Sequence, residues 1–205
     1  MPRQSSMLKA LGLAWVGVCV AGPVAAQTFS NSAPIIIRSS GAGGSNPSRI
    51  VVSGVGTSLT GLSVTLHAVG HTFPDDVDVA LVGPTGAAVV LQSDCGGSAA
   101  IGKVTYSFSD SGPALLPNAG GIGPGTYRPT DCESSDGLAA LRAVLPDLPA
   151  GGVATLGAVF GGTDPNGTWS LYVVDDSSGD SGIIQEGWSL TITSTPVELQ
   201  KFTAD

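Results

Sequence analysis

Residues 62–69 read LSVTLHAV, and apolar side chains occupy alternate positions from Leu62 to Ala68. Successive side chains of a strand point to opposite faces, so this pattern predicts a strand with one buried and one exposed face. Residues 77–82, VDVALV, repeat the alternation, with Asp78 expected to point toward solvent. The following Gly83-Pro84-Thr85-Gly86 has turn chemistry, which predicts a hairpin with residues 87–91 as the returning strand.

Further strands are predicted on both sides of this hairpin, at residues 49–53, 103–108, 168–174 and 188–193. Residues 138–145 are compatible with one or two helical turns, whereas residues 109–137 form an irregular insertion rich in Gly, Pro and Asp. Short alternating strands separated by turns are typical of sandwiches. The sequence therefore predicts an all-β fold, a jelly-roll-like antiparallel β-sandwich.

The N-terminus, residues 1–26, has the pattern of a secretory signal peptide. Arg3 and Lys9 precede a short apolar run, and Val24-Ala25-Ala26 supplies the small residues expected before a cleavage site. The run is shorter than the roughly 20 apolar residues that cross a bilayer. A lipoprotein anchored through Cys19 is disfavoured because the bulky Val18 precedes the cysteine. We expect a secreted product, extracellular or periplasmic, with no transmembrane segment after cleavage.

After cleavage, the chain is expected to divide into three parts. Residues 27–48 are rich in Ser, Gly and Asn and predict a flexible lead-in with one edge strand over residues 34–37. Residues 49–195 form the folded domain, and residues 196–205 form a C-terminal tail.

Cys95 and Cys132 are the two cysteines that remain after the leader. Two cysteines in an exported chain are expected to form a disulfide. A free thiol and a metal-binding pair are the alternatives, and zinc is disfavoured because further cysteine or histidine ligands are missing nearby.

The charge of the chain is strongly acidic, with a formal net charge of −8. This excludes a nucleic-acid partner, whose phosphates require a basic surface. Carboxylates gather in two clusters, and either could surround Ca²⁺ with oxygen ligands. The alternative is plain turn chemistry, in which Asp accepts hydrogen bonds from its own backbone. The predicted metal ligands are Asp75, Asp76 and Asp78 in the first cluster and Asp175, Asp176 and Asp180 in the second.

Two stretches together resemble the P domain, also called the Homo B domain, of subtilisin-like proprotein convertases. The first contains His71-Thr72, Asp76-Val77 and the turn ending in Pro84-Thr85-Gly86; the second contains Gly167-Thr168-Trp169-Ser170-Leu171, Asp175, Gly182 and Trp188-Ser189-Leu190. The matching motif positions are His71, Thr72, Pro84, Gly86, Gly167, Trp169, Gly182 and Trp188. The resemblance spans roughly residues 50–194, but residues 93–150 match no family motif.

The resemblance implies a jelly-roll-like sandwich of the kind that accompanies a subtilisin-like catalytic domain. Such domains support the folding, stability and calcium or pH response of that protease. Calcium is thus an expected cofactor and a secreted subtilisin-like protease an expected partner.

Catalysis by the chain itself is not expected. A serine protease needs a nucleophilic Ser, a His base and an orienting carboxylate, and the context of Gly56-Thr57-Ser58 indicates a turn instead. His67 falls on the exposed phase of its strand, and His71 is expected to bond a loop backbone. Trp169 and Trp188 are in phase with core residues.

The function predicted from sequence is therefore a secreted, non-catalytic module associated with subtilisin-like serine endopeptidases. The alternative is a cell-surface or matrix adhesion module that binds protein or glycan through its loops. An undetected hydrolase ranks third.

Overall fold

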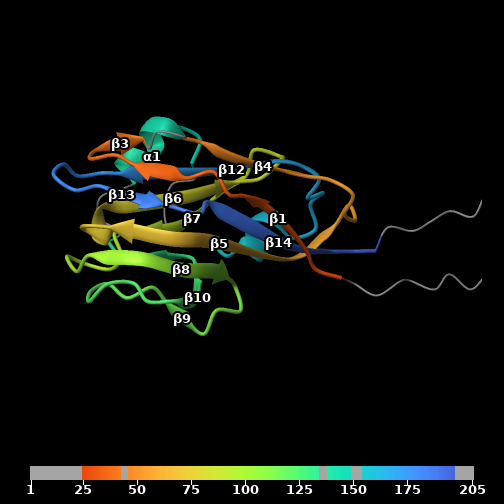
Figure 1. Ribbon diagram of the computed structural model, residues 1–205. Helices are drawn as coiled ribbons and strands as arrows, with labels where there is room; N and C mark the ends of the chain where they lie inside the picture. The colour runs from red at the N-terminus through yellow and green to blue at the C-terminus, as the bar shows by residue number, and fades with distance from the viewer. Residues whose placement is uncertain (1–24, 43–45, 134–137, 149–153, 197–205) are drawn as a thin grey trace, which may run out of the picture.

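The computed structural model describes residues 25–42, 46–133, 138–148 and 154–196 (Figure 1). The predicted signal peptide up to residue 24 and the tail beyond residue 196 lie outside the described residues. No helix in the described ranges is long and apolar enough to span a bilayer.

Two β-sheets form a sandwich, as the alternating strands predict. The first sheet contains β1 (Gln27–Asn31), β14 (Trp188–Ser194), β5 (Leu59–His71), β8 (Ile101–Ser109), β10 (Gly125–Arg128) and β9 (Ala114–Leu115), with β13 (Gly182–Ile184) and β2 (Ile35–Ile37) at one end. The second contains β11 (Thr130–Asp131), β7 (Ala88–Ser93), β6 (Val77–Val82), β12 (Gly167–Asp175), β3 (Gly41–Ala42) and β4 (Ser48–Val52). The all-β sandwich is confirmed.

Three strand pairs depart from the predicted antiparallel arrangement. β10 runs parallel to both β8 and β9, and β11 runs parallel to β7. All three pairs involve the segment predicted as an irregular insertion, residues 109–137. Two parallel neighbours must be joined by a crossover that brings the chain back to the end where the first strand began. The insertion is long enough to provide this connection between β8 and β10 and between β7 and β11.

The core lies between the sheets and is built from the inward positions of the alternating strands. Trp169 and Trp188 are fully buried, as their phase predicts. The indole of Trp169 meets Phe160 edge to face at 5.0 Å between ring centroids. Each indole N–H is satisfied inside the core, because Trp169 Nε1 donates to Pro165 O and Trp188 Nε1 donates to Ser48 Oγ, both at 2.9 Å.

The lead-in predicted to be flexible is instead folded into both sheets. β1 pairs with β14 from Gln27 to Asn31, and β2 buries Ile35 and Ile37. The Asn31 side chain also donates to Arg49 O on β4 at 3.0 Å. Phe29, Ile35 and Ile37 supply the apolar contacts of these short segments. The segments fold as strands because β14 and β13 supply their hydrogen-bond partners.

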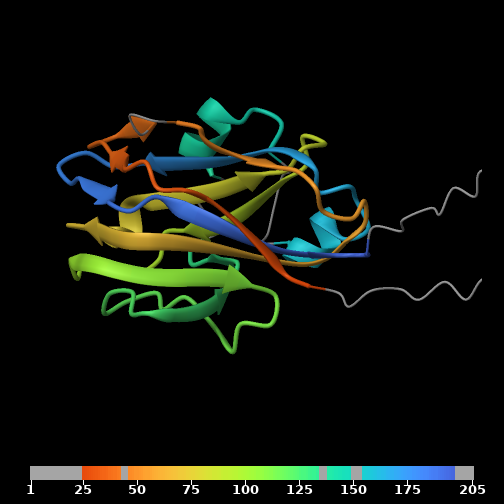
Figure 2. The same cartoon turned by 45° about the vertical axis from the view of Figure 1, so that its right-hand side comes forward.

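The outer face of the second sheet carries its own apolar layer. The predicted helix over residues 138–145 is confirmed as α1 (Ala139–Val144), at the top of the molecule in Figures 1 and 2. Its Leu141 packs in a second apolar cluster with Ala80, Val90 and Val174 of the sheet. Two short helices, α2 (Leu156–Phe160) and the 3₁₀ turn η1 (Pro74–Asp76), were not predicted.

Candidate functional site

The two stretches that carry the family resemblance meet at one corner of the sandwich. β13 pairs with β5 so that Gly182 lies opposite His71, and β12 pairs with β6 so that Asp175 lies opposite Val77. The loops beyond are joined by Asp176 N, which donates to Asp76 O at 3.0 Å. We call this region the acidic corner; its residues are His71, Thr72, Asp76, Asp175, Asp176 and Asp180.

His71 is the buried centre of the acidic corner. Its Nε2 lies 3.2 Å from Asp175 Oδ2, and both side chains are fully inaccessible to solvent. Its Nδ1 lies 2.8 Å from Phe73 O, which confirms the predicted bond to a loop backbone. A Cβ on Gly182 would overlap the imidazole ring and Gly70 O. The histidine is thus held between a carboxylate, a carbonyl and a glycine that leaves room for the ring.

The remaining motif residues also have structural roles. Thr72 Oγ1 donates to Asp180 Oδ1 at 2.9 Å, which closes the β12–β13 loop onto the end of β5. Gly86 has a φ of +86° in its turn, where L side chains are strained. Gly167 has a φ of +129° and packs directly against Pro84, so these two motif positions contact one another.

The predicted metal ligands are distributed differently from expectation. Asp78 is fully buried instead of pointing toward solvent, because α1 and its apolar cluster cover that face of β6. Asp75 Oδ1 accepts from Gly97 N at 3.0 Å, away from the second cluster. Asp175 Oδ1 accepts from Ser177 N at 3.2 Å and from Ser40 N at 3.3 Å, in the manner of a turn-capping aspartate.

The carboxylates that do come together belong to both predicted clusters. Asp76 is close enough to Asp175, Asp176 and Asp180 to experience their charges. Within the described ranges, however, no three His, Cys, Asp or Glu side chains converge in a way that could hold a metal ion.

Burial and repulsion raise the pKa of Asp76 to about 6 from its usual 3.8. Desolvation is the largest cause, followed by the negative charges of Asp175, Asp176 and Asp180, while His71 acts in the opposite direction. Since the folded state holds this proton more tightly than the unfolded chain does, ionisation of Asp76 opposes folding. The penalty is complete above about pH 6 and disappears below pH 3.8.

Asp76→Asn is therefore expected to stabilise the domain at neutral pH and to flatten its stability profile between about pH 4 and pH 6. Asp76 is only partly buried, so solvent screening limits the gain to about 1 kcal/mol. Urea unfolding across this pH range measures it, with the exposed Asp147→Asn as the matched control. Equal profiles for Asp76→Asn and the natural chain would contradict the proposed repulsion.

His67, the other histidine of the folded domain, lies on the outer face of the first sheet. It is half-buried rather than freely exposed, and its Nε2 lies 2.9 Å from Ser189 Oγ. Sequence reasoning missed this Ser–His pair, although both residues fall on the outward phase of their strands. The polar partner of the His67 ring is thus a serine hydroxyl, whereas those of the His71 ring are a backbone carbonyl and a carboxylate.

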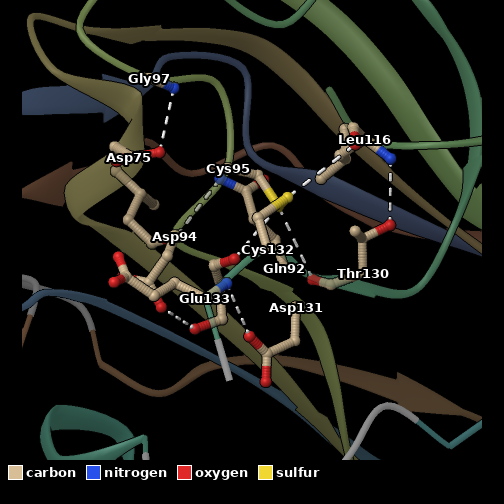
Figure 3. Close-up of a disulfide and its surroundings, with 12 residues drawn as sticks. Asp75, Gln92, Asp94, Cys95, Gly97, Leu116, Thr130, Asp131, Cys132 and Glu133 are labelled. Carbon is tan, nitrogen blue, oxygen red and sulfur yellow. Dashed lines mark hydrogen bonds between the residues drawn. A yellow bond between two sulfur atoms is a disulfide. The ribbon is translucent and has the colours of Figure 1, made fainter. Parts of the chain in front are cut away.

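The predicted disulfide is confirmed between Cys95 and Cys132, whose Cα atoms are 5.3 Å apart (Figure 3). It joins the loop after β7 to the end of β11, where Cys132 N also donates to Ser93 O at 2.9 Å. Nearby, Thr130 Oγ1 accepts from Leu116 N at 3.0 Å. The disulfide thereby anchors the insertion that matches no family motif.

A cleft of about 270 Å³ lies beside this insertion, away from the acidic corner. Its lining includes Asp110, Leu115, Arg128, Thr130 and Thr155. The Asp110 carboxylate accepts hydrogen bonds from the first two backbone N–H groups of α2, at 2.8 and 2.7 Å. This carboxylate therefore caps the N-terminus of α2.

Comparison with known proteins gives structural matches at low sequence identity. No protein-family profile matches the sequence, and no curated protein is significantly similar to it. One similar solved chain belongs to the Aeromonas sobria serine protease in complex with its chaperone, at 15% identity over 86% of this chain and 28% of that one, with a TM-score of 0.43. The A. sobria serine protease alone gives 16% identity over 85% of this chain and 27% of that one, with a TM-score of 0.36. This chain spans little more than a quarter of either, and these values are too low to assign its function.

Proposed function

We propose that this chain is a secreted, non-catalytic module of the P-domain type that binds and stabilises a subtilisin-like serine protease. The observation that carries the proposal is the acidic corner. Residues matching the family motifs come from two distant stretches of sequence, yet they contact one another through His71, Asp175 and Gly182.

The contacts at the corner favour a scaffold over an active site. His71 is buried, with Nδ1 2.8 Å from Phe73 O and Nε2 3.2 Å from Asp175 Oδ2, so it cannot reach a substrate. Thr72 and Asp180 are occupied by each other and by the loop backbone. A rigid corner with exposed loops around it suits recognition of a folded partner, because loops on a rigid scaffold are the usual carriers of binding.

Calcium belongs to this proposal as a stabilising cofactor. The negative charges of Asp175, Asp176 and Asp180 disfavour ionisation of Asp76, and a cation bound near their loops would relieve that repulsion. Secretion is also part of the proposal, supported by the predicted signal peptide and by the disulfide, which persists in oxidising compartments.

The test is capture of a labelled protease. Oxidised protein consisting of residues 27–205 is immobilised, and the source organism's culture supernatant is passed over it with calcium and with a chelator. A serine-reactive fluorophosphonate tag identifies active serine proteases in the eluate. We expect a tagged subtilisin-like protease to be retained, more strongly with calcium, while the module itself takes up no tag.

An unfolded version of the module is the control for non-specific capture, and reduction of the disulfide in mild denaturant provides it. Labelling of the module by fluorophosphonate would contradict its non-catalytic assignment. Retention of surface components without any tagged protease would instead support the adhesion alternative.

A further inference from the structure

The cleft beside the disulfide-anchored insertion contains an arginine that no acid neutralises. Arg128 is exposed, and none of the residues that the structure describes forms an ion pair with its guanidinium. In strand register it lies opposite Leu115, which is 52% exposed and also lines the cleft. A cation thus stands beside an uncovered apolar side chain, in a chain with a net charge of −8. We call this hollow the Arg128 cleft.

The other polar side chains of the Arg128 cleft are engaged within the protein. Both oxygens of Asp110 accept from backbone N–H groups of α2, and Asp131 Oδ1 accepts from a backbone N–H at 3.2 Å. The Thr130 hydroxyl accepts from a backbone N–H and donates to Arg128 O at 2.7 Å. Thr155 Oγ1 accepts from a backbone N–H of α2 at 3.1 Å, which leaves its proton for a ligand. The guanidinium and this hydroxyl are donors, so a ligand must bring an acceptor.

The walls of the Arg128 cleft are fixed by covalent and hydrogen bonds. Thr130 and Asp131 form β11, which pairs with β7 and is followed directly by the disulfide at Cys132 (Figure 3). Asp110 ties the start of α2 to the end of β8. A preformed site loses less free energy to ordering when a ligand binds. The cleft can therefore receive a ligand without rearranging its walls.

Charge and size restrict the chemistry of this ligand. The planar guanidinium fork of Arg128 matches the two oxygens of a carboxylate. The negative charges of Asp110 and Asp131 in the same lining disfavour a doubly charged anion such as phosphate, because like charges repel. The volume of about 270 Å³ lies below the range of roughly 300–1,000 Å³ that is typical of sites for drug-sized ligands. A singly charged carboxylate on a small apolar body, which can cover Leu115, fits these limits.

A second hollow of about 230 Å³ adjoins the Arg128 cleft and shares Asp110 with it. Glycines and small hydroxyl residues supply much of its lining, namely Gly61, Gly157, Gly161, Ser109 and Ser111. Such residues let another main chain approach closely, since they carry no bulky side chain. A ligand held at Arg128 can therefore continue past Asp110 as an extended chain, which favours the end of a peptide over a free amino acid.

We propose that the Arg128 cleft binds the C-terminus of a peptide that ends in an apolar residue. The α-carboxylate pairs with Arg128, with the Thr155 hydroxyl as a further donor in the lining, and the apolar side chain covers Leu115. The preceding residues run past Asp110 into the second hollow. Because proteolysis creates such peptide ends, a role in holding the products of a partner protease rests on the proposed function, whereas the binding itself does not.

The test measures the fluorescence anisotropy of N-terminally labelled tetrapeptides with oxidised protein and without any protease. One peptide ends in leucine with a free carboxylate, the second is its C-terminal amide, and the third is an amide with an internal glutamate. We expect the free acid to bind about tenfold or more tightly than either amide, because a charge-assisted hydrogen bond is lost in both. Arg128→Gln should remove the difference between acid and amide, and Leu115→Ser should weaken binding of the free acid.

Arg49→Gln is the matched control, because it removes an exposed arginine from β4 in the second sheet. It should bind the free acid as the natural chain does, and urea unfolding checks that all variants are folded. The proposal is overturned if no peptide binds, if acid and amide bind equally, or if Arg128→Gln still distinguishes them. Binding of the internal-glutamate amide as tightly as the free acid would also overturn it, since the cleft would then recognise an acidic side chain. A failure here does not bear on capture of a protease, which this assay leaves out.

Discussion

Replacing both Cys95 and Cys132 with serine is expected to lower the free energy of unfolding by about 4 kcal/mol. The disulfide closes a loop of 37 residues, and opening it returns the conformational entropy of that loop to the unfolded chain. A mature domain of this size has a stability of about 5–15 kcal/mol, so the loss is a large part of the total.

Urea unfolding of the natural and double-serine proteins at equal pH measures this difference. The natural protein under reducing conditions should unfold at the same urea concentration as the double-serine variant, which separates loss of the crosslink from any effect of the serine side chains. A change below about 1 kcal/mol would show that the insertion is held by its other contacts, such as the pairing of β11 with β7.

The second large effect is expected from Asp175→Ala, at about 3 kcal/mol of lost stability. This change leaves His71 Nε2 buried without its partner, and it removes the acceptor for Ser40 N and Ser177 N. Breaking a buried pair is costly because the remaining polar group cannot return to water.

A double-mutant cycle with His71→Ala separates the pair from its surroundings. We expect the two single changes to sum to clearly more than the double change, since both remove the same interaction. Asp147→Ala on an exposed turn is the control and should stay within about 0.5 kcal/mol of the natural chain. Additive effects of Asp175→Ala and His71→Ala would refute the proposed clamp at the acidic corner.

The sequence was most informative where one face of a strand is buried. The strand over residues 77–82 was predicted with its observed bounds, and β12 and β14 differ from prediction by one residue at most at either end. In these strands alternation reflects burial directly. Asp78 was misplaced because its face is covered by α1, which lies far along the chain and leaves no local trace in the pattern.

Short or polar strands were harder to predict. β1 contains one apolar residue, Phe29, and its order comes from the edge of β14, which no local pattern reveals. The contacts of the candidate site likewise depend on residues that are distant in sequence. The loop bond of His71 was predicted from its place at a strand end, but its partner Asp175 becomes visible only once β12 and β13 are paired with their neighbours.

The measurement that tests the central claim most directly is the lifetime of the protease. Purified oxidised module is added to the source organism's culture supernatant, and the decay of serine-protease activity on heating is followed with and without it, with the Asp175→Ala variant as a comparison. The proposed stabilising role predicts that the natural module slows the loss of activity and that the variant does so less. Identical decay in all three samples would contradict it.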